Sequence, residues 1–521
     1  MTNPSTLYRG GVLHCPADPS ATALLVAGGR ITWLGADGDA PAADRVVDLG
    51  GALVTPAFVD AHVHATDTGL ALSGLALSGV RSAAQLLDAV AAFAAGLPAD
   101  AVVLGHGWDE SGWSDPALPD AAALDRAAGG RRVYLSQASI HSALVSSALL
   151  AACPQAADAA GFDASGWLRR DAHHVVRAAA QGSVSRAQRV AAQRVALAHA
   201  ASLGIAAVHE CGGPDISDEE DFTGLLGISG AGLPEVYGYW GELGGAARAR
   251  ELGAVGAGGD LFADGALGSR TAHVSVPYGD GDGCGHGYLS AEQVRAHLVD
   301  CAAHGVQGGF HAIGDAAIST VLDGFAAAAR TVGVERLRAA RHRIEHAEIM
   351  SKRLIAGFVE YGIVASMQPA FDRLWGGAGR MYESRLGLDR SLESNPMGAM
   401  HSVGVALAFG SDSPVTPLDP WGSVRAAAAH HNPAQRMSVR AAFAAHSRGG
   451  WRAVHLDVEG VLALGAPATF AVWSTPAGVE RGLPVLLAED PELRGPGDPT
   501  PLPVCRSLVL RGEVIYEEGS S

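Results

Sequence analysis

Short apolar runs recur along the chain, and longer stretches in which apolar residues return every three or four positions separate most of them. The short runs are typical of buried strands and the longer stretches of amphipathic helices. The predicted strands are residues 55–64, 204–210, 235–240, 260–264, 306–311, 342–346, 363–368 and 405–412. The helices predicted between them include residues 291–304, 316–332 and 352–361. Strands that alternate with helices in this way predict an α/β fold, a parallel sheet closed as a (β/α)₈ TIM barrel.

Both ends of the chain have a different pattern of short alternating strands. It fills residues 7–54, where glycine pairs separate the strands, and returns at residues 469–473 and 507–516. A glycine pair between alternating apolar residues is a hairpin signal. Neither end alone has enough strands to bury one face of a sheet. We therefore expect residues 1–54 and 455–521 to pair into one small β-sandwich domain beside a barrel of residues 55–454.

A long stretch between the first two barrel strands, about residues 67–203, exceeds what one connection needs. It contains strands of its own at residues 102–105 and 133–136, together with helical segments. We interpret it as an inserted subdomain that lies over the mouth of the barrel.

The opening barrel strand ends in two histidines one residue apart, His62 and His64. Side chains alternate between the two faces of a strand, so both imidazoles point the same way, as does Asp60. Two imidazoles on one face can share a metal ion. The chain has 21 histidines, and most are surface or hydrogen-bonded core residues. The metal hypothesis therefore depends on further ligands from other strands.

Three other predicted strands also end in metal-ligating residues: His311, His346 and Asp412. The carboxyl ends of all barrel strands meet on one face, where catalytic residues gather. This brings His62 and His64 together with those three residues, although they are remote in sequence. Nitrogen ligands with one carboxylate favour zinc, with iron or manganese as weaker options. The alternative, unrelated residues at all these strand ends, requires a repeated coincidence.

Composition limits the possible partners. Hydrophobic residues make up 48% of the 521 positions and charged residues 17%, which allows a large core. The formal charge is −17, so the surface repels nucleic acids and anionic membranes, and a small-molecule substrate remains. The first residues lack a secretory signal pattern, and the six cysteines are scattered, so we expect a reducing cytoplasm. The oligomeric state stays open, with a homodimer as one option.

Several motifs resemble the amidohydrolase superfamily, in particular amidohydrolase family 3, its large-insert branch with N-substituted formamide deformylase-like and metal-dependent hydrolases. The resemblance covers nearly the whole chain. It is carried by residues 60–64, 107–109, 141–149, 263–272, 311–315, 343–346, 367–369 and 410–414. The family implies a metal-dependent hydrolase on a barrel flanked by a small β-sandwich built from both termini.

The expected reaction follows from this set of ligands. A divalent ion lowers the pKa of bound water from 15.7 to roughly 7 and polarises a carbonyl oxygen. Asp412 can take the proton of that water and pass it to the departing nitrogen. His346, if it is not itself a ligand, can hydrogen-bond the developing oxyanion. The leading hypothesis is hydrolysis of a C–N bond other than a peptide bond, in an amide or an N-acyl or N-formyl amine.

Two other functions remain open. The same metal centre serves deamination of a ring or hydrolysis of a cyclic amide. A catalytically idle barrel that acts as a binding or regulatory protein belongs to another class, although the intact ligand set argues against it.

Three residues are candidates for substrate binding: Trp108, Arg270 and Gln368. For Trp108, packing of the insert is an equal alternative. Arginines in the position of Arg270 more often close a structural ion pair than bind a substrate. Gln368 ends a barrel strand at the mouth, so its position favours a functional role.

The resemblance also bears on the number of ions. Many relatives hold two metals bridged by a carbamylated lysine on the fourth strand, where this chain has Asp260. The sole lysine, Lys352, begins a predicted outer helix. We expect the short side chain of Asp260 to stop before it reaches both metal positions. The sequence therefore favours one tightly bound ion over two, held by His62, His64, His311 and Asp412, with His346 as a weak ligand or hydrogen-bonding partner. Recruitment of a second ion by Asp260 or Glu210 at high metal concentration stays open.

Overall fold

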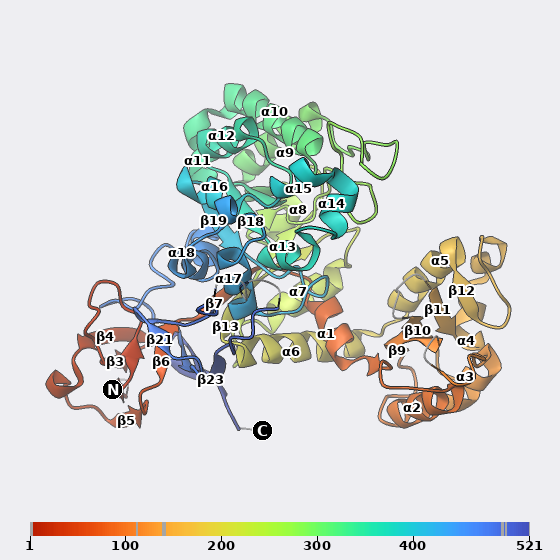
Figure 1. Ribbon diagram of the computed structural model, residues 1–521, viewed down its shortest axis with the longest axis horizontal. Coiled ribbons are helices and arrows are strands. Elements are labelled where there is room, and N and C mark those ends of the chain that lie inside the picture. Colours follow the sequence, from red (N-terminus) through yellow and green to blue (C-terminus); the bar gives the residue numbers. More distant parts are fainter. Residues whose placement is uncertain (1–3, 111–112, 138–141, 491–493, 495–496, 520–521) are drawn as a thin grey trace. The chain divides into compact units, whose positions relative to one another are not determined.

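The predicted barrel is present in the computed structural model, which describes residues 4–110, 113–137, 142–490, 494 and 497–519. Within these residues, eight parallel strands form one sheet. In order they are β7 (Phe58–Val63), β13 (Ile205–Gly212), β14 (Glu235–Trp240), β15 (Gly256–Ala257), β16 (Gln307–Ala312), β17 (Arg343–His346), β18 (Val364–Met367) and β19 (Ala406–Phe409). A parallel bridge between Val63 and Ser413 joins the last strand region to the first. The (β/α)₈ prediction is thus confirmed (Figure 1).

The barrel strands are buried on both faces because helices cover the outside of the sheet. Every residue of β7 and β13 is buried, as expected for parallel strands that read as continuous apolar runs. The helices that follow β13 along the chain are α7 (Glu219–Gly227), α8 (Ala246–Glu251), α9 (Ala291–His304), α10 (Asp315–Val332), α11 (Val334–Ala340), α12 (Lys352–Tyr361), α13 (Pro369–Trp375), α14 (Met381–Leu386), α15 (Leu388–Leu392), α16 (Met397–Ser402), α17 (Pro420–Ala428), α18 (Val439–Ala445) and α19 (Arg448–Ala453). Figure 1 shows α9 to α12 grouped on one side.

The fourth strand differs from the prediction. Residues 260–264 were expected to form it, but the regular strand is Gly256–Ala257 and an irregular stretch follows it. Gly258 and Gly259 in that stretch have positive φ (158° and 76°), which interrupts the regular pairing. Pairing with β16 resumes at a parallel bridge from Phe262 to His311. There the N–H of His311 donates to the carbonyl of Leu261, and the N–H of Ala263 donates to the carbonyl of His311. Asp260 therefore lies in an irregular stretch between two paired parts of this strand region.

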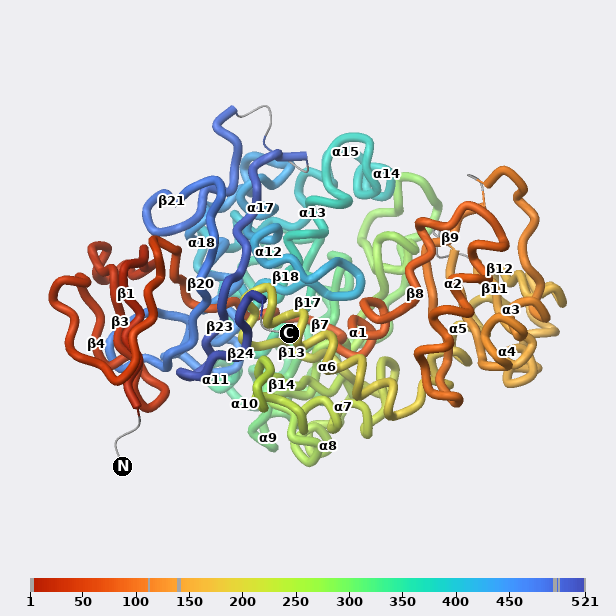
Figure 2. The backbone as a smooth tube through the Cα atoms, turned by 90° about the horizontal axis from the view of Figure 1, so that it is seen from below, coloured from red at the N-terminus to blue at the C-terminus, as the bar shows by residue number. Residues whose placement is uncertain are grey.

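The two ends of the chain meet in a pair of small sheets. One sheet is formed by β4 (Arg30–Gly35), β3 (Ala23–Ala27), β1 (Thr6–Arg9) and β5 (Arg45–Asp48). The other combines both ends, in the order β2 (Val12–Leu13), β6 (Leu53–Pro56), β20 (Phe470–Ser474), β23 (Val504–Leu510) and β24 (Glu513–Glu517). One apolar core contains Tyr8 and Leu24 from the first sheet and Phe470 and Val509 from the second. Figure 2 shows β1 and β3 beside β20.

Residues Thr66–Ala196 form a separate compact unit with its own sheet and cores. The order of its described strands is β12 (Trp167–Arg169), β11 (Ser142–Val145), β10 (Val133–Gln137), β9 (Val103–Trp108) and β8 (Leu75–Ala76). Its helices are α2 (Ala83–Ala95), α3 (Ala121–Ala127), α4 (Ser147–Ala151) and α5 (Arg170–Gln181). The chain passes between the units within α1 (Ala65–Ser73) and α6 (Arg186–Ser202). The placement of this insert over the barrel mouth stays a prediction, and His141, the first residue of one family motif, lies outside the described residues.

None of the described helices is, on its own, both long and apolar enough to cross a bilayer. Helices α10 and α11 meet the length and composition criteria only together, and the chain bends by 116° between them.

A buried histidine before β17 gives the barrel a predictable response to acid. His342 accepts a hydrogen bond at Nδ1 from the backbone N–H of Gly308 (2.7 Å), and burial lowers its pKa from 6.5 to about 3. Between these pH values the unfolded chain binds a proton that the folded protein does not. The stability supplied by the neutral ring is therefore complete above pH 6.5 and is lost as the pH falls toward 3.

We predict that lowering the pH from 7 to 5 reduces the free energy of unfolding by about 2 kcal/mol less in His342→Gln than in the wild type. The amide oxygen of the glutamine can accept the same hydrogen bond. Urea unfolding at the two pH values measures this difference. His401→Gln, which changes an exposed histidine, serves as the control and should behave as the wild type does. An unchanged pH dependence in His342→Gln would contradict the assignment.

Candidate metal centre

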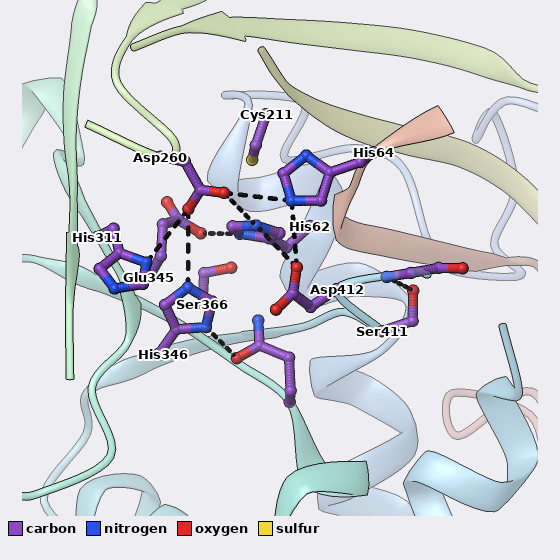
Figure 3. A network of polar contacts seen from close by, with 12 residues as sticks. His62, His64, Cys211, Asp260, His311, Glu345, His346, Ser366, Ser411 and Asp412 are labelled. Atoms are coloured by element: carbon purple, nitrogen blue, oxygen red, sulfur yellow. Dashed lines mark hydrogen bonds and ion pairs between the residues drawn. The ribbon is translucent and has the colours of Figure 1, made fainter. Parts of the chain in front are cut away.

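The five predicted metal ligands lie together at the carboxyl ends of their strands (Figure 3). The side chain of Asp412, which follows β19, approaches the two histidines of the first strand. Its Oδ1 is 3.5 Å from Nε2 of His62 and 3.2 Å from Nε2 of His64. The rings of His311 and His346 are in edge contact, with centroids 4.5 Å apart. The convergence expected from the barrel is therefore what the structure has.

Asp260 lies at the centre of this cluster, which corrects the expectation that its side chain is too short. Its Oδ2 is 3.5 Å from Nε2 of His62 and 3.2 Å from Nε2 of His64. Its Oδ1 is 3.4 Å from Nδ1 of His311 and 3.7 Å from Nε2 of His346. Asp260 lies in the irregular stretch after β15, where Gly258 and Gly259 interrupt the regular strand, so the strand geometry on which that expectation rested does not hold there.

Fixed acceptors orient three of the imidazoles. Nδ1 of His62 donates to Glu345 (2.9 Å), and Nδ1 of His346 donates to the side-chain oxygen of Gln368 (2.8 Å). Nε2 of His311 donates to the carbonyl of Gly265 (3.2 Å). The second nitrogen of each ring then carries a lone pair and faces Asp260. Outer hydrogen bonds fix the tautomer and the ring plane in this way around many protein metal sites.

The residues present fit a divalent metal ion. Nε2 of His62, Nδ1 of His311 and Oδ1 of Asp260 are buried and have no hydrogen-bond partner among the described residues. Such atoms cost free energy unless something pairs with them, and a cation would accept all three lone pairs. Imidazole nitrogens with carboxylate oxygens suit zinc, iron or manganese.

The electrostatics of the site also favour a cation. Burial lowers the pKa of His64, but Asp260 and Asp412 outweigh it and raise that pKa well above its ordinary value. Burial likewise raises the pKa of Asp260, while His62 and the neighbouring histidines bring it well below its ordinary value. The two carboxylates therefore stabilise positive charge between the rings, and a metal ion can supply that charge in place of protons.

Two of the ligands lie in a backbone conformation that residues other than glycine rarely adopt. His346 has φ 70° and Asp412 has φ 57°. Asp412 is held there because its N–H donates to the carbonyl of His62 (2.8 Å), and the N–H of His64 donates to the carbonyl of Ser413 (2.9 Å). Such conformations cluster at functional sites, where surrounding contacts compensate the strain.

A buried ion pair below the histidines had no role in the sequence prediction. Arg343 is fully buried, donates twice to Glu345, and also donates to the carbonyl of Ala61 and the hydroxyl of Ser366. Burial raises the pKa of Glu345, but Arg343 and then His62 outweigh it and hold that pKa well below its usual range. Residues 343 and 345 are two positions apart on β17, so both side chains lie on one face of the strand. An arginine and a glutamate at this spacing in the motif 343–346 are the sequence signal that could have indicated the pair.

The three candidate substrate contacts lie in different surroundings. Gln368 is buried beside His346, and its Nε2 has no hydrogen-bond partner in the described part of the chain. Arg270 makes a bidentate ion pair with Asp280, at 3.0 Å for both contacts, which favours the structural alternative. Trp108 is fully buried in a core of the second unit and donates to the carbonyl of Leu135, which favours packing. Only the position of Gln368 supports a substrate contact.

A mutation of the buried pair tests how far it supports metal binding. We predict that Glu345→Gln weakens metal binding about 10- to 100-fold, because His62 loses its charged acceptor and Arg343 is left unpaired. Titration of the dialysed protein with Zn²⁺ measures the change. Glu459→Gln is the matched control, since Glu459 is also buried and accepts from an arginine, Arg511, away from the site. Equal zinc affinity in the two variants would contradict the role of Glu345.

Comparisons with known proteins agree with this arrangement. The model of the Amidohydrolase family matches residues 45–516. YtcJ of Bacillus subtilis, which carries an amidohydrolase name, is 27% identical over 274 residues, 50% of this chain and 46% of that protein. The protein LONG AFTER FAR-RED 3 of Arabidopsis thaliana is 32% identical over 225 residues, 41% of this chain and 38% of that protein. The match thus spans less than half the length of these curated relatives.

Two solved structures share the fold across nearly the whole chain. An uncharacterized metal-dependent hydrolase from Pyrococcus furiosus has a TM-score of 0.75 at 24% identity and covers 90% of this chain and 98% of its own. A similar protein from Pyrococcus horikoshii has a TM-score of 0.73 at 21% identity, with 95% and 99% covered. At these identities the likeness establishes the fold.

Proposed function

The chain belongs to the amidohydrolase family, and from that premise we propose that it is a metal-dependent hydrolase that cleaves a C–N bond of a small molecule. The substrate class that we favour is an amide or an N-acyl or N-formyl amine, outside peptide bonds. We propose zinc as the metal. The observation that carries the proposal is that four histidines and Asp412 converge at the barrel mouth. Several of their ring nitrogens are buried there and have no hydrogen-bond partner among the described residues.

The side chains of the site differ in how far solvent reaches them. His64 and Asp412 keep 12% and 10% of their side-chain surface exposed, whereas His62 and His346 keep 0% and 2%. His311 keeps 9%, so the rings of His64 and His311 and the carboxylate of Asp412 border the accessible part of the site, and a substrate would reach it there. A bound divalent ion would lower the pKa of a water molecule and polarise the substrate carbonyl.

The role that we propose for Asp412 is proton transfer. One carboxylate oxygen lies beside His62 and His64, and the side chain borders the accessible side of the site. A carboxylate there can accept a proton from the attacking water and deliver it to the departing nitrogen. The carboxylate has to be ionised to begin this cycle.

Gln368, rather than His346, is the donor that we propose for the substrate carbonyl. Nδ1 of His346 already donates to Gln368, so its other nitrogen faces Asp260 without a proton in the neutral ring. This favours His346 as a metal ligand. The amide N–H groups of Gln368 have no partner among the described residues and can hydrogen-bond an oxygen that becomes negative.

The first test is turnover by the metal-loaded protein on a panel of N-formyl amines, N-acyl amino acids and cyclic amides. We expect release of a carboxylate and an amine from an acyclic substrate. Release of ammonia, or turnover of the cyclic compounds alone, would favour the deaminase or cyclic amide alternative instead. No turnover of any compound with metal bound would favour a binding or regulatory protein.

The second test is the variant Asp412→Asn, assayed on the best substrate of the panel. At saturating zinc we expect turnover to fall about 10²- to 10⁴-fold, because an amide cannot accept the proton. Asp323→Asn, which changes an exposed aspartate on α10, is the control and should keep wild-type turnover. Near-normal turnover by Asp412→Asn would remove the proton-transfer role.

A further inference from the structure

Asp260 divides the metal centre into two sets of donor atoms. Its Oδ2 faces Nε2 of His62 and His64, at 3.5 and 3.2 Å, and Asp412 joins the same set. Its Oδ1 faces Nδ1 of His311 and Nε2 of His346, at 3.4 and 3.7 Å. A carboxylate whose two oxygens each face a separate pair of imidazoles has the arrangement of a bridging ligand. Figure 3 shows these contacts spreading from Asp260 in both directions.

We propose that Asp260, unmodified, bridges two divalent ions in this protein. The first ion takes His62, His64, Asp412 and one oxygen of Asp260. The second takes His311, His346 and the other oxygen. The inference rests on the proposed metal-dependent function, which it deepens by naming the bridging residue and the number of ions.

The backbone supplies the reach that the short side chain lacks. After β15, Gly258 passes so close to the next strand that a Cβ there would lie 2.3 Å from the nitrogen of Gly309. A Cβ on Gly259 would lie 3.0 Å from Cys211, and one on Gly241 would lie 3.0 Å from the backbone of Asp260. Close approach on these sides requires residues without side chains. The packed loop holds Asp260 against the inner ends of the strands.

Three other residues that could bridge two ions either lie away from the site or already contact other groups. The sole lysine, Lys352, begins helix α12 on the outside of the barrel and is exposed. Glu210 accepts a hydrogen bond from the backbone N–H of Ala65 (2.8 Å). Cys211 lies near His62 and Glu345, on the side of His62 away from the second pair of rings. Among the described residues, Asp260 is the carboxylate that lies within 4 Å of all four imidazoles.

The test counts ions in the full-length protein, independently of activity. Protein loaded with Zn²⁺ is dialysed without bicarbonate, and zinc per chain is measured for the wild type, Asp260→Glu, Asp260→Asn and Cys211→Ser. We expect two equivalents in the wild type, in Asp260→Glu and in Cys211→Ser, and one or fewer in Asp260→Asn. One equivalent in the wild type, two in Asp260→Asn, or loss of an ion in Cys211→Ser would each overturn the proposal.

A variant that restores lysine gives a sharper comparison. Asp260→Lys can form a bridging carbamate only from dissolved carbon dioxide, so we expect it to retain a second ion only with bicarbonate, whereas the wild type does not respond. A bicarbonate requirement in the wild type would overturn the proposal. If the Asp260 variants fail to fold by circular dichroism, Mn²⁺ replaces zinc in the wild type, and electron paramagnetic resonance decides. Spin-coupled manganese supports a bridge, and an uncoupled signal overturns it.

This experiment separates the inference from the proposed function. A protein that holds one ion and hydrolyses an amide would overturn the bridge and keep the function. A protein that holds two ions and turns over nothing would do the reverse.

Discussion

The metal centre depends on the buried ion pair of Arg343 and Glu345. An unpaired charge in the barrel interior would cost several kcal/mol, so the two residues have to be present together. Arg343 also donates to Ala61 on β7 and to Ser366 on β18, and its guanidinium lies 4.3 Å from the ring centre of Tyr239 on β14. The pair therefore links β17 to β7 across the barrel and to its neighbour β18, and the carboxylate of Glu345 accepts a hydrogen bond from the ring of His62. One buried ion pair thus connects three strands and orients a predicted ligand.

Above that pair, the fold brings together groups that repel each other or lack partners. The carboxylates of Asp260 and Asp412 both lie beside Nε2 of His62 and Nε2 of His64. Several lone pairs of the site have no hydrogen-bond donor among the described residues. The positive φ of His346 and Asp412 adds strain at the same place. A bound cation relieves the repulsion and satisfies the lone pairs, so its binding free energy also stabilises the fold. This coupling between binding and folding is one reason for expecting tight binding.

The sequence predicted the parts of this structure that depend on local periodicity. Helices 291–304 and 352–361 have the predicted bounds, and the strand ends place His62, His311 and Asp412 as expected. It did not predict features that depend on which distant groups meet. Arg343 and Glu345 support the site only through their hydrogen bonds to β7 and β18, which no local pattern shows. Trp108 was a candidate contact because of its motif, but its burial depends on the packing of its own unit.

Asp260 shows why a family motif cannot be transferred by side-chain length alone. From a strand position an aspartate would end well short of where a longer side chain reaches, and that argument holds while the backbone stays in the sheet. Here the glycines at 258 and 259 interrupt the regular strand just before Asp260, so its backbone does not follow the path that the argument assumes. A loop that packs closely through glycines is a rigid support, and a short side chain on it loses little rotamer entropy when it binds. The position of a ligand atom is the sum of backbone path and side-chain length, and this chain changes both.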